Sequence, residues 1–191
     1  MLFVDPTVRT RIEPLLRRVL LVEPNPHQAQ LLSECLTAFG GGDFAFQADR
    51  DAAVEAARTF DPTLIVTEAF DDADPFALVR SIRRSTMGCR QAAVVVLTTL
   101  ATASALQAAK NAGVNEFLRK PFNRRDLLRR LDHLSTPRPW VDKPAYAGPD
   151  RRTFNSGAAR RRLSDRVELI GQGVPATQLY RTTPSPLASE A

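Results

Sequence analysis

The chain has 191 residues, 43% of them hydrophobic, and carries a formal net charge of +5. That length accommodates one domain with additional segments, and the apolar content is sufficient for a globular core. The sequence has no run approaching the roughly 18 apolar residues that a membrane span requires, and Asp5 and Pro6 follow the first residues too closely for a secretory signal. Cys35 and Cys89 lack the spacing of a metal site and are expected to be buried thiols in a reducing cytoplasm.

Charge is distributed unevenly along the chain. Residues 18–134 hold 14 basic and 14 acidic side chains, whereas residues 135–191 hold 9 basic and 5 acidic ones. The sequence pI near 9.9 therefore comes from the ends of the chain and not from a basic domain. This distribution argues against a DNA-binding domain.

Short apolar runs without alternation mark the expected strands, because parallel strands are covered on both faces. The expected strands are residues 19–22, 44–46, 63–67, 93–97 and 116–118. Between and after them lie helical patterns: one from Pro26 to the glycines at 40–42, and others over residues 52–58, 75–84, 103–112 and 123–134. This alternation predicts an α/β fold with a doubly wound, five-stranded parallel sheet, whose site lies at the carboxyl ends of the strands.

The composition changes after Leu134. Frequent proline and few apolar clusters predict a largely disordered, Pro/Arg-rich tail over residues 135–191. Trp140 and Tyr146 are the side chains that could hold the first part of this tail against the domain.

The sequence before residue 18 is an N-terminal extension, residues 1–17, that precedes the predicted domain of residues 18–134. Two interpretations stay open for it. It either adds a turn of helix with Ile12, Leu15 and Leu16 against the domain, or it contributes nothing.

Polar side chains stand at the ends of four expected strands: Glu23, Glu68, Thr98 and Lys120. Their types and order, together with the stretch 113–122, resemble the receiver domain of response regulators over residues 18–134. The resemblance implies the CheY-like strand order 2-1-3-4-5. It also implies a cis peptide bond between Lys120 and Pro121 that directs the lysine into the site.

Glu68 stands where the receiver family has its phosphoacceptor aspartate, and Pro24 replaces one of the two acids after the first strand. In the family these acids and the acceptor bind Mg²⁺, which neutralises charge during phosphoryl transfer. Glu23 keeps the first acid, but Pro24 supplies no side-chain ligand, and Glu68 is longer than aspartate by about 1.5 Å. We therefore expect no cofactor and at best a weak metal site at Glu23 and Glu68.

Three interpretations of this pocket remain open. Glu68 pairs with Lys120 in an inactive pocket, or it imitates the charged acceptor and holds the domain near an active-like state, or slow residual phosphorylation persists.

Thr98 and Phe117 match the hydroxyl and aromatic residues that in the family couple the site to the surface of the fourth helix, fifth strand and fifth helix. The alternative is that Phe117 is a core residue and Thr98 an ordinary strand residue. The surface carries the basic residues Arg119, Arg124, Arg125, Arg129 and Arg130, with only Glu116, Asp126 and Asp132 as acids. Such a surface suits an acidic protein partner or a homodimer, although most charge runs are simply solvated.

The tail contains a short repeat, in which Gly148-Pro149-Asp150-Arg151-Arg152 returns as Gly157-Ala158-Ala159-Arg160-Arg161. Arginine binds phosphate through two parallel hydrogen bonds and reads guanine edges. The repeat resembles the arginine-rich extensions of CheY-like cyclic di-GMP effectors. That resemblance implies nucleotide binding through Arg151, Arg152, Arg160, Arg161 and Arg162. Unspecific attraction to polyanions and a solubilising or docking role are the alternatives.

The sequence thus predicts a stand-alone receiver-like protein of two-component signalling, a pseudo-receiver that acts by protein contact without phosphorylation. The alternative function is a cyclic di-GMP effector. An enzyme is not expected, because His27 and His133 lack a nucleophile partner and no glycine-rich phosphate loop is present.

Overall fold

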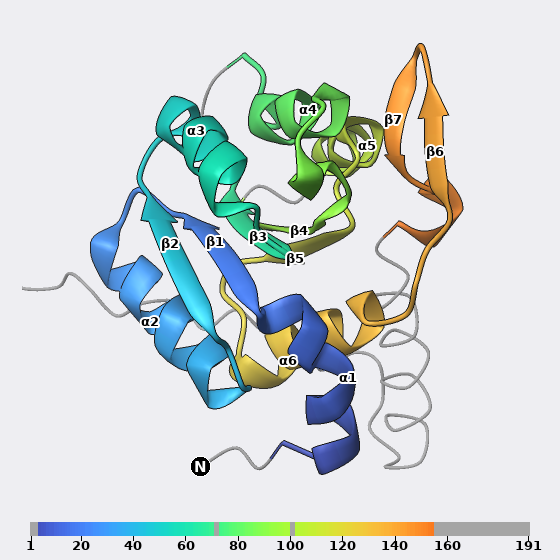
Figure 1. Ribbon diagram of the computed structural model, residues 1–191. Helices are drawn as coiled ribbons and strands as arrows, with labels where there is room; N and C mark the ends of the chain where they lie inside the picture. Colours follow the sequence, from blue (N-terminus) through green and yellow to red (C-terminus); the bar gives the residue numbers. More distant parts are fainter. Residues whose placement is uncertain (1–3, 71–72, 100–101, 155–191) are drawn as a thin grey trace, which may run out of the picture. The chain divides into compact units, whose positions relative to one another are not determined.

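The computed structural model describes residues 4–70, 73–99 and 102–154. Its centre is a five-stranded parallel sheet with the order β2-β1-β3-β4-β5 (Figure 1), which confirms the predicted fold class and strand order. The strands are β1 (Arg18–Val22), β2 (Asp43–Gln47), β3 (Leu64–Glu68), β4 (Ala93–Thr98) and β5 (Glu116–Arg119).

Helices cover both faces of the sheet, and each face has its own apolar cluster. Strand residues of alternate parity supply the two clusters, as expected when successive side chains point to opposite faces. The first face is covered by α1 (Pro6–Leu16), α2 (Pro26–Ala38) and α6 (Arg124–Leu134), and the second by α3 (Arg50–Phe60), α4 (Ala77–Arg84) and α5 (Ala103–Ala112).

Local sequence accounts for most helix ends. The Asn25 side chain accepts hydrogen bonds from the first turn of α2, where Pro26 needs no intrahelical donor. Asn123 and Asp126 form a reciprocal capping box at the start of α6. Gly113 ends α5 with φ of 89°, a left-handed conformation that favours glycine.

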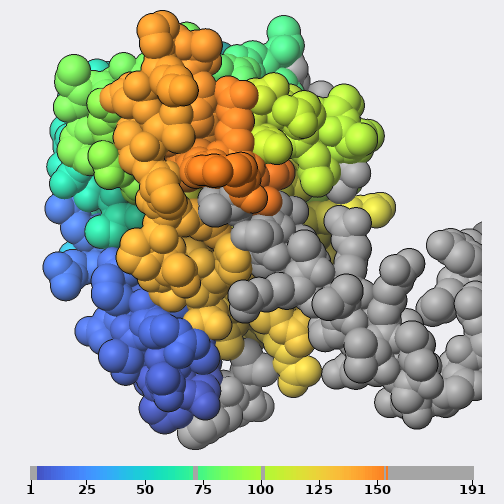
Figure 2. Space-filling model, turned by 90° about the vertical axis from the view of Figure 1, so that its right-hand side faces the viewer, coloured from blue at the N-terminus to red at the C-terminus, as the bar shows by residue number. Residues whose placement is uncertain are grey.

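The N-terminal extension forms helix α1, which settles the question that its sequence left open. Ile12 and Leu16 are fully buried, and Leu15 packs against the same cluster. Arg11 donates to Asp132 of α6 at 2.6 Å, and Figure 2 shows α1 in blue against the gold surface of α6. The extension is therefore part of the described fold.

Part of the predicted disordered tail is regular structure. Residues 140–149 form an antiparallel hairpin of β6 (Trp140–Lys143) and β7 (Tyr146–Pro149), and Figure 2 shows it in orange between α4 and α5. Its proline content suggested disorder, but the hairpin is held by tertiary contacts that no local pattern encodes. Residues 155–191 lie outside the described residues, and the predicted disorder there stays a prediction.

Arg83 of α4 links the sheet to this hairpin. Its guanidinium is 1% exposed and donates to the carbonyls of Gly113, Arg90 and Ala92 and to the Asn115 side chain. Burial lowers its pKa to about 10, so the group stays charged at neutral pH.

The Trp140 side chain packs against the guanidinium group of Arg83. The Trp140 ring lies 5.4 Å from the guanidinium carbon of Arg83 and 5.6 Å from that of Arg90. Arg90 also forms an ion pair, at 2.9 Å, with Asp142, which lies on the same strand as Trp140. These contacts fix the hairpin against α4.

The connection between α6 and the hairpin is anchored on Glu116. This carboxylate is fully buried in β5 and accepts hydrogen bonds from Arg130 and Arg138, each at 2.9 Å. The His133 ring lies 3.1 Å from the same carboxylate and also contacts Arg138. A buried charge is tolerated when it is paired and hydrogen-bonded in this way.

Two further expectations concern the chain as a whole. Cys35 and Cys89 are free and buried, as expected, and burial raises the pKa of both thiols. No helix in the described ranges combines the length and apolar character needed to cross a bilayer.

Candidate functional site

The structure brings three of the predicted site residues together at the carboxyl ends of the strands. Lys120, after β5, donates from Nζ to Oε2 of Glu68 at 2.6 Å and to Oε2 of Glu23 at 2.9 Å. Glu68 ends β3, and Glu23 follows β1. The side chains are 14% exposed for Lys120, 25% for Glu68 and 4% for Glu23, so solvent only partly screens the two ion pairs.

Two neighbours complete the site and were not predicted. Oε1 of Gln28, in the first turns of α2, accepts a third hydrogen bond from Lys120 Nζ at 2.7 Å. The main-chain N–H of Asn25 donates to Oε1 of Glu23 at 3.1 Å. An ammonium group has three N–H donors, and all three have acceptors here. No local signal in the sequence marks Gln28 as a member of the site.

Burial acts against the charged form of both Glu68 and Lys120, but the neighbouring groups affect their pKa values differently. Burial raises the pKa of Glu68, although the hydrogen bond from Lys120 opposes the shift and the charge of Glu23 adds to it. Burial alone would lower the pKa of Lys120, but its hydrogen bonds and proximity to Glu68 and Glu23 outweigh burial and raise that pKa. The site therefore holds the lysine firmly in its charged form.

The peptide bond between Lys120 and Pro121 is cis, as the resemblance implied. The lysine side chain extends from this bond toward Glu23 and Glu68. The two carboxylates come from the ends of adjacent strands, since β1 pairs with β3.

The donor set does not fit Mg²⁺, which requires several oxygen ligands in octahedral geometry. Pro24 supplies no side-chain oxygen beside Glu23, and one oxygen of each glutamate is already bonded to Lys120. Among the described residues no group of three or more acidic, His or Cys side chains is arranged to hold a metal.

Thr98 and Phe117 lie on the adjacent strands β4 and β5. Thr98 ends β4, is 3% exposed, and its carbonyl accepts from the N–H of Lys120 at 2.8 Å. Phe117 is 3% exposed and its ring lies 6.4 Å from that of Phe76, tilted by 57°. Phe117 is thus a core residue in this structure, and its coupling role stays a prediction.

The basic surface of the fourth helix, fifth strand and fifth helix corresponds to α5, β5 and α6. Two of its predicted members point inward: Arg130 and Glu116 pair with one another in the core. Asp126 is buried in the capping box, and Asp132 pairs with Arg11. Four arginines of this surface are exposed and form no ion pair with any described residue. They are Arg119, Arg124, Arg125 and Arg129.

Of the five tail arginines, two lie within the described residues. Arg151 stacks on the Tyr146 ring, with its guanidinium carbon 4.0 Å from the centroid. Arg152 pairs with Asp150 through Nη2 and Oδ2 at 2.5 Å. Both therefore have partners inside the hairpin region. The remaining three, Arg160, Arg161 and Arg162, lie outside the described residues.

A doubly wound sheet of this order, with acidic residues and a lysine converging at its carboxyl edge, defines the receiver class of signalling domain. The family model of the response regulator receiver domain matches residues 19–132, more than half of the chain. The chain belongs to this family, and is a receiver-domain protein of two-component signalling. Receiver domains are typically signalling modules rather than enzymes. No curated protein matches the sequence significantly.

The fold of this chain resembles those of solved receiver domains. The receiver domain of sensor histidine kinase PA1611 from Pseudomonas aeruginosa PAO1 is 28% identical, with a TM-score of 0.55 over 62% of this chain and 97% of that one. The chemotaxis protein CheY4 of Vibrio cholerae is 25% identical, with a TM-score of 0.55 over 61% and 96%. A CheY-like receiver protein of Methanospirillum hungatei JF-1 is 19% identical, with a TM-score of 0.55 over 63% and 94%.

The PA1611 receiver domain has a magnesium ion coordinated in its active-site cleft. The Mn²⁺-bound form of response regulator Rcp1 is a further solved structure that this chain resembles, with 23% identity and a TM-score of 0.51 over 62% of this chain and 91% of that one.

Proposed function

We propose that this receiver domain signals without phosphorylation, by contact with a protein partner. The observation that carries the proposal is the saturated ammonium group of Lys120, whose three donors bind Glu68, Glu23 and Gln28. A phosphoryl group at residue 68 would need a free cationic donor and a metal to offset its charge. Neither requirement is met by the described side chains of the pocket.

The glutamate supplies a permanent carboxylate where the family adds negative charge transiently. Glu68 holds Lys120 at 2.6 Å, so the lysine needs no phosphoryl oxygen to occupy a defined position. In this proposal the domain keeps one state, and regulation comes from the presence of its partner.

The partner is expected at the α5–β5–α6 surface and is expected to be acidic there. Arg119, Arg124, Arg125 and Arg129 are exposed on it, and charge of one sign on one surface steers an oppositely charged partner. Photo-crosslinking in cells from residue 124 tests this surface, with exposed residue 81 on α4 as the control position. Adducts that form equally from both positions would contradict it.

Labelling with acetyl phosphate and Mg²⁺ tests independence from phosphorylation. The wild-type chain is expected to incorporate no phosphate, whereas the double variant Glu68→Asp/Pro24→Asp regains an acceptor and a metal ligand and is expected to be labelled. Labelling of the wild-type chain at Glu68 would refute the proposal. A double variant that stays inert would count against the assignment of residue 68 to the acceptor position.

The cyclic di-GMP hypothesis remains a separate, untested alternative. The contacts of Arg151 with Tyr146 and of Arg152 with Asp150 assign these two side chains to the hairpin, which leaves residues 160–162 as the arginines for a ligand. Calorimetry with cyclic di-GMP on the full chain separates the two groups. If the nucleotide binds, alanine at 160–162 is expected to abolish heat release and alanine at 151–152 to preserve it.

A further inference from the structure

The outer edge of β2 is an exposed sheet edge. In the order β2-β1-β3-β4-β5, β2 pairs only with β1, and no other described strand adjoins it. Unpaired strand edges are templates for pairing with another chain, and proteins usually protect them with lysine, proline or bulges. Strand β2 has none of these, since its sequence is Asp43-Phe44-Ala45-Phe46-Gln47.

The hydrogen bonds of β2 identify which main-chain groups face outward. The N–H of Asp43 donates to the Arg17 carbonyl at 3.0 Å, and the carbonyl of Gln47 accepts from the Glu23 N–H at 3.0 Å. The main-chain N–H and C=O groups of Asp43, Ala45 and Gln47 therefore point toward β1. Because the direction of main-chain groups alternates along a strand, the N–H and C=O groups of Phe44 and Phe46 face the free edge.

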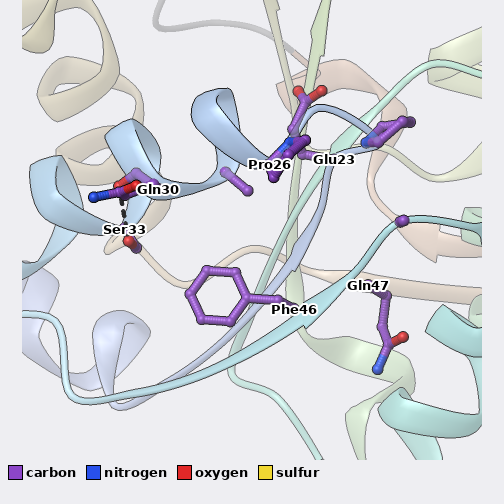
Figure 3. Close-up of a pocket in the computed structure, with 9 residues that line it drawn as sticks. Glu23, Pro26, Gln30, Ser33, Phe46 and Gln47 are labelled. Carbon is purple, nitrogen blue, oxygen red and sulfur yellow. Dashed lines mark hydrogen bonds between the residues drawn. The ribbon is translucent and has the colours of Figure 1, made fainter.

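The same two residues carry the apolar side chains at this edge. The Phe44 and Phe46 rings stack with centroids 6.2 Å apart, and Phe46 is 50% exposed. Beside Phe46 lies a hollow of about 390 Å³ between β2 and α2 (Figure 3), which is lined by Glu23, Pro24, Pro26, Ala29, Gln30, Ser33, Phe46, Gln47 and Ala48. An exposed aromatic ring next to an open hollow lacks a partner on its outer side.

We propose that a second copy of this chain pairs with β2 in antiparallel orientation, with the twofold axis at Ala45. In that register Phe44 lies opposite Phe46 of the second copy, and each such pair exchanges both N–H···O=C bonds. All four outward-facing groups of Phe44 and Phe46 are then satisfied on each copy. The four phenylalanine rings lie on one face and form cross-strand aromatic pairs.

Charge at the edge is compatible with a twofold contact, in which identical surfaces meet. Asp43 faces Gln47 of the second copy, so no like charges oppose one another along the strand. On the adjoining helix α3 two ion pairs form within each copy, Arg50 with Asp51 at 3.8 Å and Arg58 with Glu55 at 3.5 Å. Asp49, which caps this helix, is a further exposed carboxylate there.

This dimer leaves the opposite edge of the sheet free. Strand β5 lies at the far end of the strand order from β2, so each copy keeps its own α5–β5–α6 surface. The dimer would present two such surfaces to a partner, which raises avidity when both can engage.

Sedimentation analysis of the full chain across the micromolar range tests the dimer, with two matched variants. Among the described residues, Phe46 and Leu31 are the exposed large apolar side chains, at 50% and 64%. Leu31 is therefore a matched control for Phe46. Phe46→Lys is expected to shift the measured mass from two chains to one, whereas Leu31→Lys on α2 leaves the dimer intact. A wild-type chain that stays monomeric, or equal effects of both variants, overturns the proposal.

Disulfide trapping tests the register without weakening the edge. Ala45 faces its own counterpart as a non-hydrogen-bonded pair, in which Cα atoms lie about 4.5 Å apart, within reach of a disulfide. Ala45→Cys is therefore expected to form a covalent dimer with diamide as oxidant, whereas Gln47→Cys, which faces Asp43, is not. The wild-type chain, whose cysteines are buried, is the control. Equal cross-linking of both variants, or of neither, contradicts this register.

Discussion

Lys120 Nζ lies 2.6 Å from Oε2 of Glu68, so the carboxylate at the end of β3 is bonded directly to the lysine that follows β5. Glu23 and Gln28 take the other two donors of the same ammonium group. A side chain one methylene longer than aspartate thus reaches the lysine without a phosphoryl group between them. This contact agrees with the interpretation of an inactive pocket, and it is equally the contact required if Glu68 imitates a charged acceptor.

Removal of Lys120 is expected to destabilise the fold. Lys120→Met leaves the carboxylates of Glu23 and Glu68 close together and partly buried without a counter-charge, which costs about 3 kcal/mol when one partner of a largely buried pair is lost. Urea unfolding measures the change. Lys143→Met, at an exposed position of the hairpin, is the control and is expected to stay within about 0.5 kcal/mol of wild type. Equal losses in both variants would contradict a special role for Lys120.

The ion pairs of Lys120 with Glu68 and Glu23 also predict that the free energy of unfolding depends on pH in the alkaline range. The pKa of Lys120 is raised in the folded state, so the unfolded lysine releases its proton first, near pH 10.4. The stabilisation from the ammonium group is therefore complete below that pH and is lost as pH rises through the higher folded-state pKa. The difference in unfolding free energy between wild type and Lys120→Met should be constant near neutrality and shrink in this alkaline range. A difference that grows there would reverse the assigned sign.

Arg83 is expected to be more important for stability than its neighbour. Arg83→Met removes the donor from the buried carbonyls of Gly113, Arg90 and Ala92, whereas Asn115 Oδ1 still accepts from the N–H of Val94. We expect a loss of about 3 kcal/mol or more. Arg84 is exposed on the same helix, so Arg84→Met is the matched control and should cost less than about 0.5 kcal/mol. Thermal and urea unfolding would show the contrast. Similar stabilities of the two variants would mean that water replaces the guanidinium group without penalty.

The hairpin should unfold together with the domain. Trp140 is the single tryptophan of the chain, and it packs on Arg83 and Arg90, so its fluorescence reports the hairpin directly. Its unfolding transition is expected to coincide with the loss of helical circular dichroism, as in a two-state unit. A fluorescence transition at lower urea concentration would instead show that the hairpin opens as a separate unit.

The strands of the sheet and four residues at its carboxyl edge could be predicted from local sequence patterns. Unbroken apolar strands, Asn25 with Pro26 at the start of α2, and Gly113 at the end of α5 are local signals, because each depends on residues close in the chain. They place Glu23, Glu68, Thr98 and Lys120 at one edge without knowledge of any long-range contact. The receiver pattern at Lys120-Pro121 added the cis bond that the structure shows.

The contacts that join distant segments could not be predicted from the sequence and became visible in the folded chain. Gln28 reaches Lys120 because α2 passes beside the end of β5, and nothing near residue 28 indicates this. Arg130 and Glu116 were assigned to an exposed surface, but the chain beyond α6 brings Arg138 onto Glu116 and buries the group. In the proline-rich segment that follows, Trp140 packs on the guanidinium groups of Arg83 and Arg90 and thereby holds the hairpin against α4. These are long-range electrostatic and stacking contacts, whose energy depends on geometry rather than on local sequence.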